Sequence, residues 1–247
     1  MAQTSAGRKA LPTAVADGID IANWADRYGG RISVPIQSYR QGAAEEGIYF
    51  IGTNATPATG IAATTSMIAY DASAGAKGVY FVIKNSETST ANTSKRIIPD
   101  FIKMRLITQA PTSATDWQAT TVLDLGTRYT SGGSTITGVN ASTDSSVSSV
   151  ALVYAGAVTC AAATSSVKLL GTTLLRAQVP VILDQYTIVF GGSEGGGPIV
   201  SAAGVQNLVF SHPPVIIGPN YALFIHLYGT ANAAAPAWEF VLGWLEK

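Results

Sequence analysis

The sequence predicts an all-β protein: a jelly-roll-like antiparallel β-sandwich that follows an N-terminal extension with a short helix. From residue 47 onward, roughly eight to ten short runs of β-branched or aromatic residues alternate with Gly, Pro, Asn, Asp and Ser. No helical period separates these runs, which argues against alternating α/β winding. No repeat of about 20 to 50 residues is visible, which argues against a propeller or a solenoid.

Composition limits the partners that this chain can attract. Of its 247 residues 12% are charged, and 15 basic residues balance 15 acidic ones. Long-range attraction to nucleic acid or to an anionic membrane needs a basic excess, so we expect neither partner. The 47% apolar content excludes a disordered chain. A neutral surface also offers little repulsion between copies, so we expect self-association.

The first 46 residues differ from the rest of the chain. They hold ten of the thirty charged residues, five of each sign. A short helix is predicted at residues 15–28, because Ile19, Trp24 and Tyr28 fall roughly on one face. Pro12 before the segment and two glycines after it fit the ends of a helix. We therefore divide the chain into an N-terminal arm or docking segment, residues 1–46, and a sandwich domain, residues 47–247.

The apolar side chains of this arm indicate docking. Ile19, Ile21 and Trp24 are too few to form a core of their own, so they must pack on something else. Two alternatives stay open at this point. The segment packs on its own sandwich, or it is an arm that docks on a partner.

The strands of the sandwich follow from short apolar runs. In the first half they are predicted at residues 47–51, 78–85, 101–108 and 116–125, and residues 128–138 are interpreted as a Gly-rich turn. Residues 101–108 alternate, so Ile102, Met104 and Leu106 should face the core, while Lys103 and Arg105 face solvent or a neighbour. In the second half the predicted strands are residues 149–158, 165–182, 186–192, 207–211 and 237–245.

Residues 211–229 predict a final hairpin. Two apolar runs flank Gly218-Pro219-Asn220, which supplies turn residues. In the second run, Leu223, Ile225 and Leu227 should face the core. Phe224, His226 and Tyr228 then lie on the opposite face. Since exposed aromatic residues are enriched at interfaces, we predict that these three form the interface of a homo-oligomer, most simply a trimer.

Catalytic and metal sites are not predicted. The two histidines, His212 and His226, are fourteen residues apart with no His-x-His pair, so His212 is interpreted as a loop residue and His226 as structural or interfacial rather than as a ligand or base. Cys160 is single and lies among small residues, which suggests a buried small hydrophobe. The chain has no G-x-S-x-G, and residues 191–198 lack the Lys-Ser/Thr ending of a phosphate loop. We expect no enzyme and no cofactor.

A resemblance to known proteins rests on six segments of the chain, in this order: "EEGIYFIGTNATPATGIAATTS", "GVYFVIKN", "IPDFIKMRLIT", "DLGTRYTSGGSTITGVNASTDSS", "VTCAAA" and "PPVIIGPNYALFIHLYG". In strand order and composition, the chain from about residue 45 resembles jelly-roll structural proteins of bacteriophage virions that decorate or build the head, or form knobs on it. The resemblance includes no catalytic motif. It implies trimers assembled through sandwich faces, an N-terminal segment that contacts the shell, and the major capsid protein or other virion proteins as partners.

Two other classes of function compete with this one. A carbohydrate-binding module or the receptor-binding head of a fibre is also a β-sandwich, and would bind a host-surface glycan through exposed aromatic residues. For each candidate, a place in the core or in an interface between subunits is the rival interpretation. The candidate glycan-binding residues are Trp117, Tyr129, Tyr228 and Trp238. A cupin-like or hydrolytic enzyme would be revealed by bound metal.

Sequence also gives an expectation for location. The chain shows no signal peptide and no apolar run of about 18 residues that could span a membrane. We therefore expect a soluble protein that is made in the host cytoplasm and assembled into the virion.

Overall fold

The computed structural model describes residues 39–54, 56–63, 79–88, 94–108, 117–124, 128–161, 167–176, 180–191, 199–200, 204–229 and 236–247. Contacts divide the chain into two units, Met1–Tyr39 and Arg40–Lys247, and almost all of the described residues belong to the second. These residues form one short helix and fourteen strands, which confirms the all-β prediction. The helix predicted at residues 15–28 lies outside the described residues.

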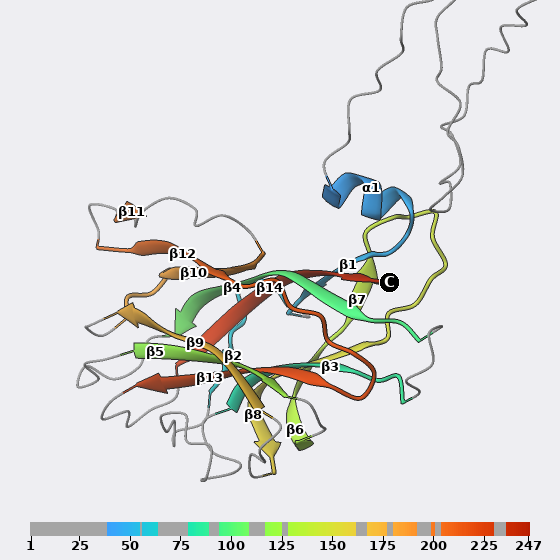
Figure 1. Ribbon diagram of the computed structural model, residues 1–247. Coiled ribbons are helices and arrows are strands. Elements are labelled where there is room, and N and C mark those ends of the chain that lie inside the picture. Colours follow the sequence, from blue (N-terminus) through green and yellow to red (C-terminus); the bar gives the residue numbers. More distant parts are fainter. Residues whose placement is uncertain are drawn as a thin grey trace, which may run out of the picture. The chain divides into compact units, whose positions relative to one another are not determined.

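Two sheets form the sandwich, as two layers in Figure 1. The larger sheet has the order β11-β12-β10-β4-β14-β1-β7, with β2 beside β14: β11 (Ile199–Val200), β12 (Gln206–His212), β10 (Gln185–Phe190), β4 (Ile97–Thr108), β14 (Ala237–Glu246), β1 (Tyr49–Thr53), β7 (Gly138–Asn140) and β2 (Ile61–Ala62). The smaller sheet has the order β6-β8-β3-β13-β5-β9: β6 (Tyr129–Ile136), β8 (Ala151–Cys160), β3 (Val79–Asn85), β13 (Ala222–Gly229), β5 (Trp117–Asp124) and β9 (Val167–Arg176).

Eight of these strands have the connectivity of a jelly roll. In chain order they are β1, β3, β4, β5, β9, β10, β13 and β14. The first pairs with the eighth, the second with the seventh, the third with the sixth and the fourth with the fifth, and all four pairs are antiparallel. β14 also lies beside β4, and β13 beside β5, which completes the two sheets. This is a long hairpin rolled into a sandwich, as the sequence predicted.

Two insertions, and the two-residue strand β2 between β1 and β3, enlarge the eight-stranded frame. β6, β7 and β8 lie between β5 and β9 in the chain, while β11 and β12 lie between β10 and β13. The interpretation of residues 128–138 as a turn is wrong, because most of them form the edge strand β6. Gly132 and Gly133 have φ angles of 81° and 82°, and the register of β6 against β8 shifts near them. These glycines therefore allow bulges in a strand rather than ending it.

The predicted final hairpin is also wrong. Residues 213–221 connect β12 in the larger sheet to β13 in the smaller one, and within them Ile217 makes an isolated bridge to Ile97. The turn residues behave as expected, since Asn220 has a φ of 62° and the Tyr221 amide donates to the Gly218 carbonyl at 3.1 Å. A turn signal can thus mark a connection between sheets as well as a hairpin.

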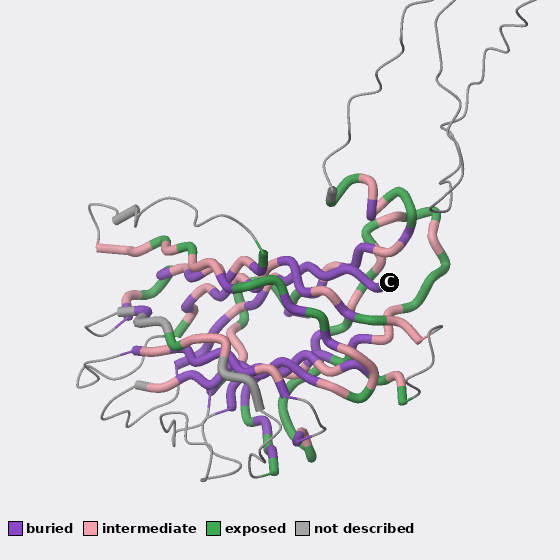
Figure 2. Tube along the Cα trace, in the orientation of Figure 1, coloured by how far each residue is buried: buried purple, intermediate pink, exposed green. Residues whose placement is uncertain are grey.

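Both sheets bury their facing side chains, and buried stretches run through the strands of both layers in Figure 2. Ile102, Met104 and Leu106 are buried as predicted, while Lys103 and Arg105 on the other face are half-buried. The largest fully buried side chains are Trp117, Trp238, Trp244, Tyr80, Tyr186, Phe50, Phe81, Phe224 and Phe240. All of these except Phe224 belong to the main core, and large aromatic side chains contribute strongly to such a core because each buries a large apolar area.

The helix α1 (Tyr39–Glu45) is held against the sandwich. Ala43 is buried in a cluster with Tyr49 and Leu245. The Nε of Arg40 donates to Asp100 at 2.6 Å, and the hydroxyl of Tyr49 donates to the same carboxylate at 2.7 Å. Residues 40–45 therefore pack with the domain, although the predicted arm ends at residue 46.

Candidate functional site

The predicted interface lies on β13, a central strand of the smaller sheet. Leu223, Ile225 and Leu227 point into the main core, as the alternation predicted. Phe224 and His226 point the other way, but they are 0% and 2% exposed. The expectation that these two side chains form an exposed face is therefore wrong.

A second apolar cluster covers the outer face of β13. Phe224 packs in it together with Val79, Val82, Val158, Cys160 and Ala222, and Tyr129 and Tyr154 lie against it. The guanidinium of Arg128 lies over the Phe224 ring, 4.9 Å from its centroid, and its Nε donates to Asp124 at 2.5 Å. The cover comes from the start of β6, which the sequence interpretation had assigned to a turn.

Of the three predicted interface residues, Tyr228 is only partly buried. It lies near the end of β13, opposite Gln118 of β5. Tyr228 is therefore the residue of this face that a second subunit could contact. Its role in an interface stays a prediction.

The two histidines do not form a common site. His212 is the last residue of β12 and lies between the sheets, where its Nε2 is 3.0 Å from the hydroxyl of Thr121 on β5. Its interpretation as a loop residue is wrong, because Phe190 of β10 pairs with it in the sheet. Burial lowers the pKa of His212, because the charged form of the ring loses hydration there. His226 lies on the other face of the smaller sheet.

Titratable groups offer little chemistry. Cys160 is buried, and burial raises the pKa of its thiol to about 12, which opposes formation of the nucleophilic thiolate. Among the described residues, no group of three or more His, Cys, Asp or Glu side chains could hold a metal ion. Most of the Gly-rich segment 191–198 lies outside the described residues.

The aromatic candidates for glycan binding fall into two groups. Trp117 and Trp238 are 0% exposed and their rings lie against each other in the core, tilted by 60°, so neither can present a ring to a sugar. Tyr129 is partly buried and stacks on Tyr154, with ring centroids 4.6 Å apart and ring planes 7° from parallel. Its hydroxyl donates to the Gly132 carbonyl.

An apolar surface feature that the sequence interpretation missed lies between β9 and β10. In the turn formed by Val181 to Asp184, Ile182 and Leu183 are 45% and 52% exposed. Leu183 has a φ of 76°, a region that is strained for a bulky side chain. The strand predicted at residues 165–182 had included the first two residues of this turn.

Hydrogen bonds hold this turn, which we name the 181–184 tip, in one conformation. The buried carboxylate of Asp184 accepts from the amides of Val181 and Gln206, both at 2.8 Å, and from the hydroxyl of Tyr186 at 3.2 Å. The Leu183 amide donates to the carbonyl of Leu106 at 2.8 Å. The tip therefore presents two exposed aliphatic side chains on a backbone that is fixed by hydrogen bonds and strained at Leu183.

The predicted docking residues Ile19, Ile21 and Trp24 lie outside the described residues. Within the part of the chain that is described, no helix is long and apolar enough to cross a membrane.

Comparison of the chain with protein-family models, curated protein sequences and solved structures gives no match.

Proposed function

We propose that this chain is a structural protein of a bacteriophage virion, a jelly-roll subunit that decorates or builds the head by self-association and by docking on the capsid. The observation that carries the proposal is the 181–184 tip. A buried carboxylate fixes this turn while Ile182 and Leu183 remain in solvent. A neighbouring subunit that covered these two side chains would remove their apolar area from water and would order little, because the turn is already fixed.

The jelly-roll connectivity and the composition give additional support. Jelly rolls are recurrent building units of viral capsids, although they also occur in lectins and cupins, so the fold alone is a weak argument. The chain has a net charge of zero, which lowers repulsion between neighbouring subunits. The arm of residues 1–46 then provides the contact with the shell, and the sandwich provides contacts between copies in a trimer.

The direct experiment is quantitative mass spectrometry of purified phage particles from cells in which this gene is expressed. The proposal expects peptides of the chain in fixed stoichiometry to the major capsid protein, retained through a density gradient. Absence of the chain from purified particles, with the protein recovered only in the soluble lysate, would overturn it.

A further inference from the structure

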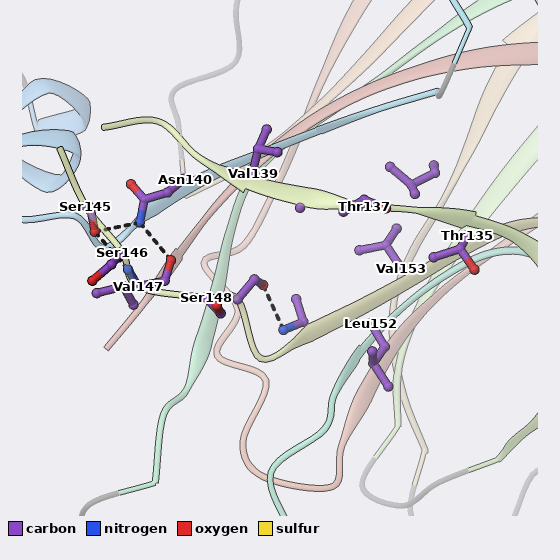
Figure 3. A pocket seen from close by; sticks show the side chains of 14 residues that line it. Thr135, Thr137, Val139, Asn140, Ser145, Ser146, Val147, Ser148, Leu152 and Val153 are labelled. Carbon is purple, nitrogen blue, oxygen red and sulfur yellow. Dashed lines mark hydrogen bonds between the residues drawn. The ribbon is translucent and has the colours of Figure 1, made fainter. Parts of the chain in front are cut away.

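A cavity of about 500 Å³ opens at the side of the sandwich, where the chain passes from β6 in the smaller sheet to β7 in the larger one. Figure 3 shows its two walls. One wall is formed by the end of β6, the residue that follows it and β7, and carries Thr135, Thr137 and Val139. The opposite wall is the segment that leads into β8 together with the first residues of β8, with Val147 and Leu152 among its side chains.

The chemistry of these walls is uniform. None of the fourteen residues that line the cavity is charged. The hydroxyls of Thr135, Thr137, Ser146 and Ser148 make no hydrogen bond within the described part of the chain. Between them lie exposed aliphatic side chains, since Val139, Val147 and Leu152 are 60%, 43% and 38% exposed.

One end of the loop that forms the second wall is fixed by Asn140. Its Nδ2 lies within hydrogen-bonding distance of the Gly47 carbonyl at 2.8 Å, the Ser145 hydroxyl at 3.1 Å and the Val147 carbonyl at 3.3 Å. Its Oδ1 accepts from the amide of Ser142 at 2.9 Å. A single amide thus ties the loop to β7 and to the chain before β1.

The buried carboxylate of Glu246 fixes the other end. It accepts from the hydroxyl of Ser149 at 2.5 Å and from the amide of Val150 at 3.0 Å. Lys95 lies 3.7 Å from the same carboxylate and donates to the Ser148 carbonyl, so its charge is paired at this anchor. The walls are therefore held in place before any ligand arrives, which lowers the entropy lost on binding.

We propose that this cavity binds a short segment of a neutral carbohydrate. Hydroxyl side chains both donate and accept hydrogen bonds, which matches the hydroxyls of a sugar ring. The three aliphatic side chains can cover the C–H faces of the same ring and remove apolar area from water. A charged ligand would lose its hydration in a cavity that offers no counter-charge. The volume lies within the range of small-molecule sites.

Saturation-transfer difference NMR on the full chain tests the proposal. The probes are neutral trisaccharides (maltotriose, cellotriose and N-acetylchitotriose) and, for comparison, the acidic trigalacturonate. We expect saturation transfer to at least one neutral trisaccharide and none to trigalacturonate. Thr135→Arg, which places a long side chain in the cavity, should abolish the signal, whereas Ser131→Arg on the same strand but outside the cavity should preserve it.

Other outcomes overturn the proposal. The first is that no neutral trisaccharide receives saturation from the protein. The second is equal saturation transfer in the Thr135→Arg and Ser131→Arg variants, and the third is stronger transfer to trigalacturonate than to the neutral probes. If Thr135→Arg does not fold, Ser146→Arg on the opposite wall takes its place. The result is independent of the proposed role in a particle, because Thr135→Arg can lose the glycan signal and still be incorporated into virions, and the reverse can also be observed.

Discussion

His212 of β12 and Thr121 of β5 join the two sheets by a hydrogen bond of 3.0 Å inside the sandwich. Burial lowers the pKa of His212 from its ordinary value of 6.5, because an imidazolium loses hydration there. The unfolded chain therefore binds a proton at pH values where the folded chain does not.

The free energy of unfolding should consequently fall as the pH drops below about 6.5, and level off once the pH passes the lowered pKa of the folded state. Urea denaturation at a series of pH values from about 7 to about 5 measures this dependence. His212→Gln keeps hydrogen-bonding capacity without titrating, so it should flatten the curve in this window. An identical pH dependence in both proteins would contradict the prediction.

Glu246 should be among the most sensitive positions of the domain. Its carboxylate accepts from the indole Nε1 of Trp244 at 3.0 Å as well as from Ser149 and the amide of Val150. Glu246→Ala leaves these donors without their acceptor, which should lower the free energy of unfolding by about 2–4 kcal/mol. Glu45→Ala on the exposed side of α1 is the control and should change it by less than about 0.5 kcal/mol. Equal effects in urea denaturation would argue against this anchoring role.

Local hydrophobic patterns in the sequence were sufficient to predict the strands of the eight-stranded frame. The alternation of residues 101–108 correctly placed Ile102, Met104 and Leu106 in the core, because a half-buried strand exposes every second residue. The same rule correctly divided β13 into two faces. It could not show that the second face is also covered, since the cover is provided by Arg128 and Tyr129, nearly a hundred residues earlier in the chain.

Glycines and apolar runs misled the interpretation where tertiary structure overrides local preference. Gly132 and Gly133 resemble a turn in sequence but form bulges in β6, which pairs with β8 along most of its length. The strand predicted at residues 165–182 ends earlier, at Arg176, and Asp184 fixes a turn at its predicted end by accepting hydrogen bonds from two amides. Neither outcome depends on neighbouring residues alone.

The 181–184 tip allows assembly and folding to be separated. Leu183→Asn removes an exposed aliphatic side chain and replaces it with a residue that tolerates positive φ, where an ordinary side chain costs about 1–2 kcal/mol. The melting temperature should therefore stay the same or rise, while sedimentation velocity shows a smaller fraction of oligomer. Ile216→Asn, at a residue that is 57% exposed on another connection, should leave assembly unchanged. If neither variant reduces the fraction of oligomer, the 181–184 tip is not part of the interface.

Tyr228 tests the remaining part of the predicted interface. Because Tyr228 is the partly buried member of the three predicted interface residues, Tyr228→Glu should weaken the predicted trimer without unfolding the sandwich. Light scattering gives the mass, and far-UV circular dichroism checks the fold. Phe224→Glu is the contrasting variant and should unfold the domain, since its side chain is 0% exposed. A monomeric parent protein at micromolar concentration would contradict the predicted oligomer.

Two truncations test whether the N-terminal segment is a docking arm or a structural part of the sandwich domain. Deletion of residues 1–38 leaves α1 in place and should give a protein that melts near the parent temperature but no longer joins particles. Deletion of residues 1–46 also removes the buried Ala43 and the ion pair of Arg40 with Asp100. It should lower the free energy of unfolding by about 1–3 kcal/mol, because apolar contacts with Tyr49 and Leu245 are lost.

The two deletions must be compared in the same particle-binding assay, since the longer one can fail for two reasons. Only the shorter deletion removes the proposed contact with the shell while preserving the domain. If it folds and still joins particles at normal occupancy, the docking role passes from the arm to the sandwich. If it unfolds instead, residues 1–38 pack on their own sandwich, and the alternative that the sequence left open is the correct one.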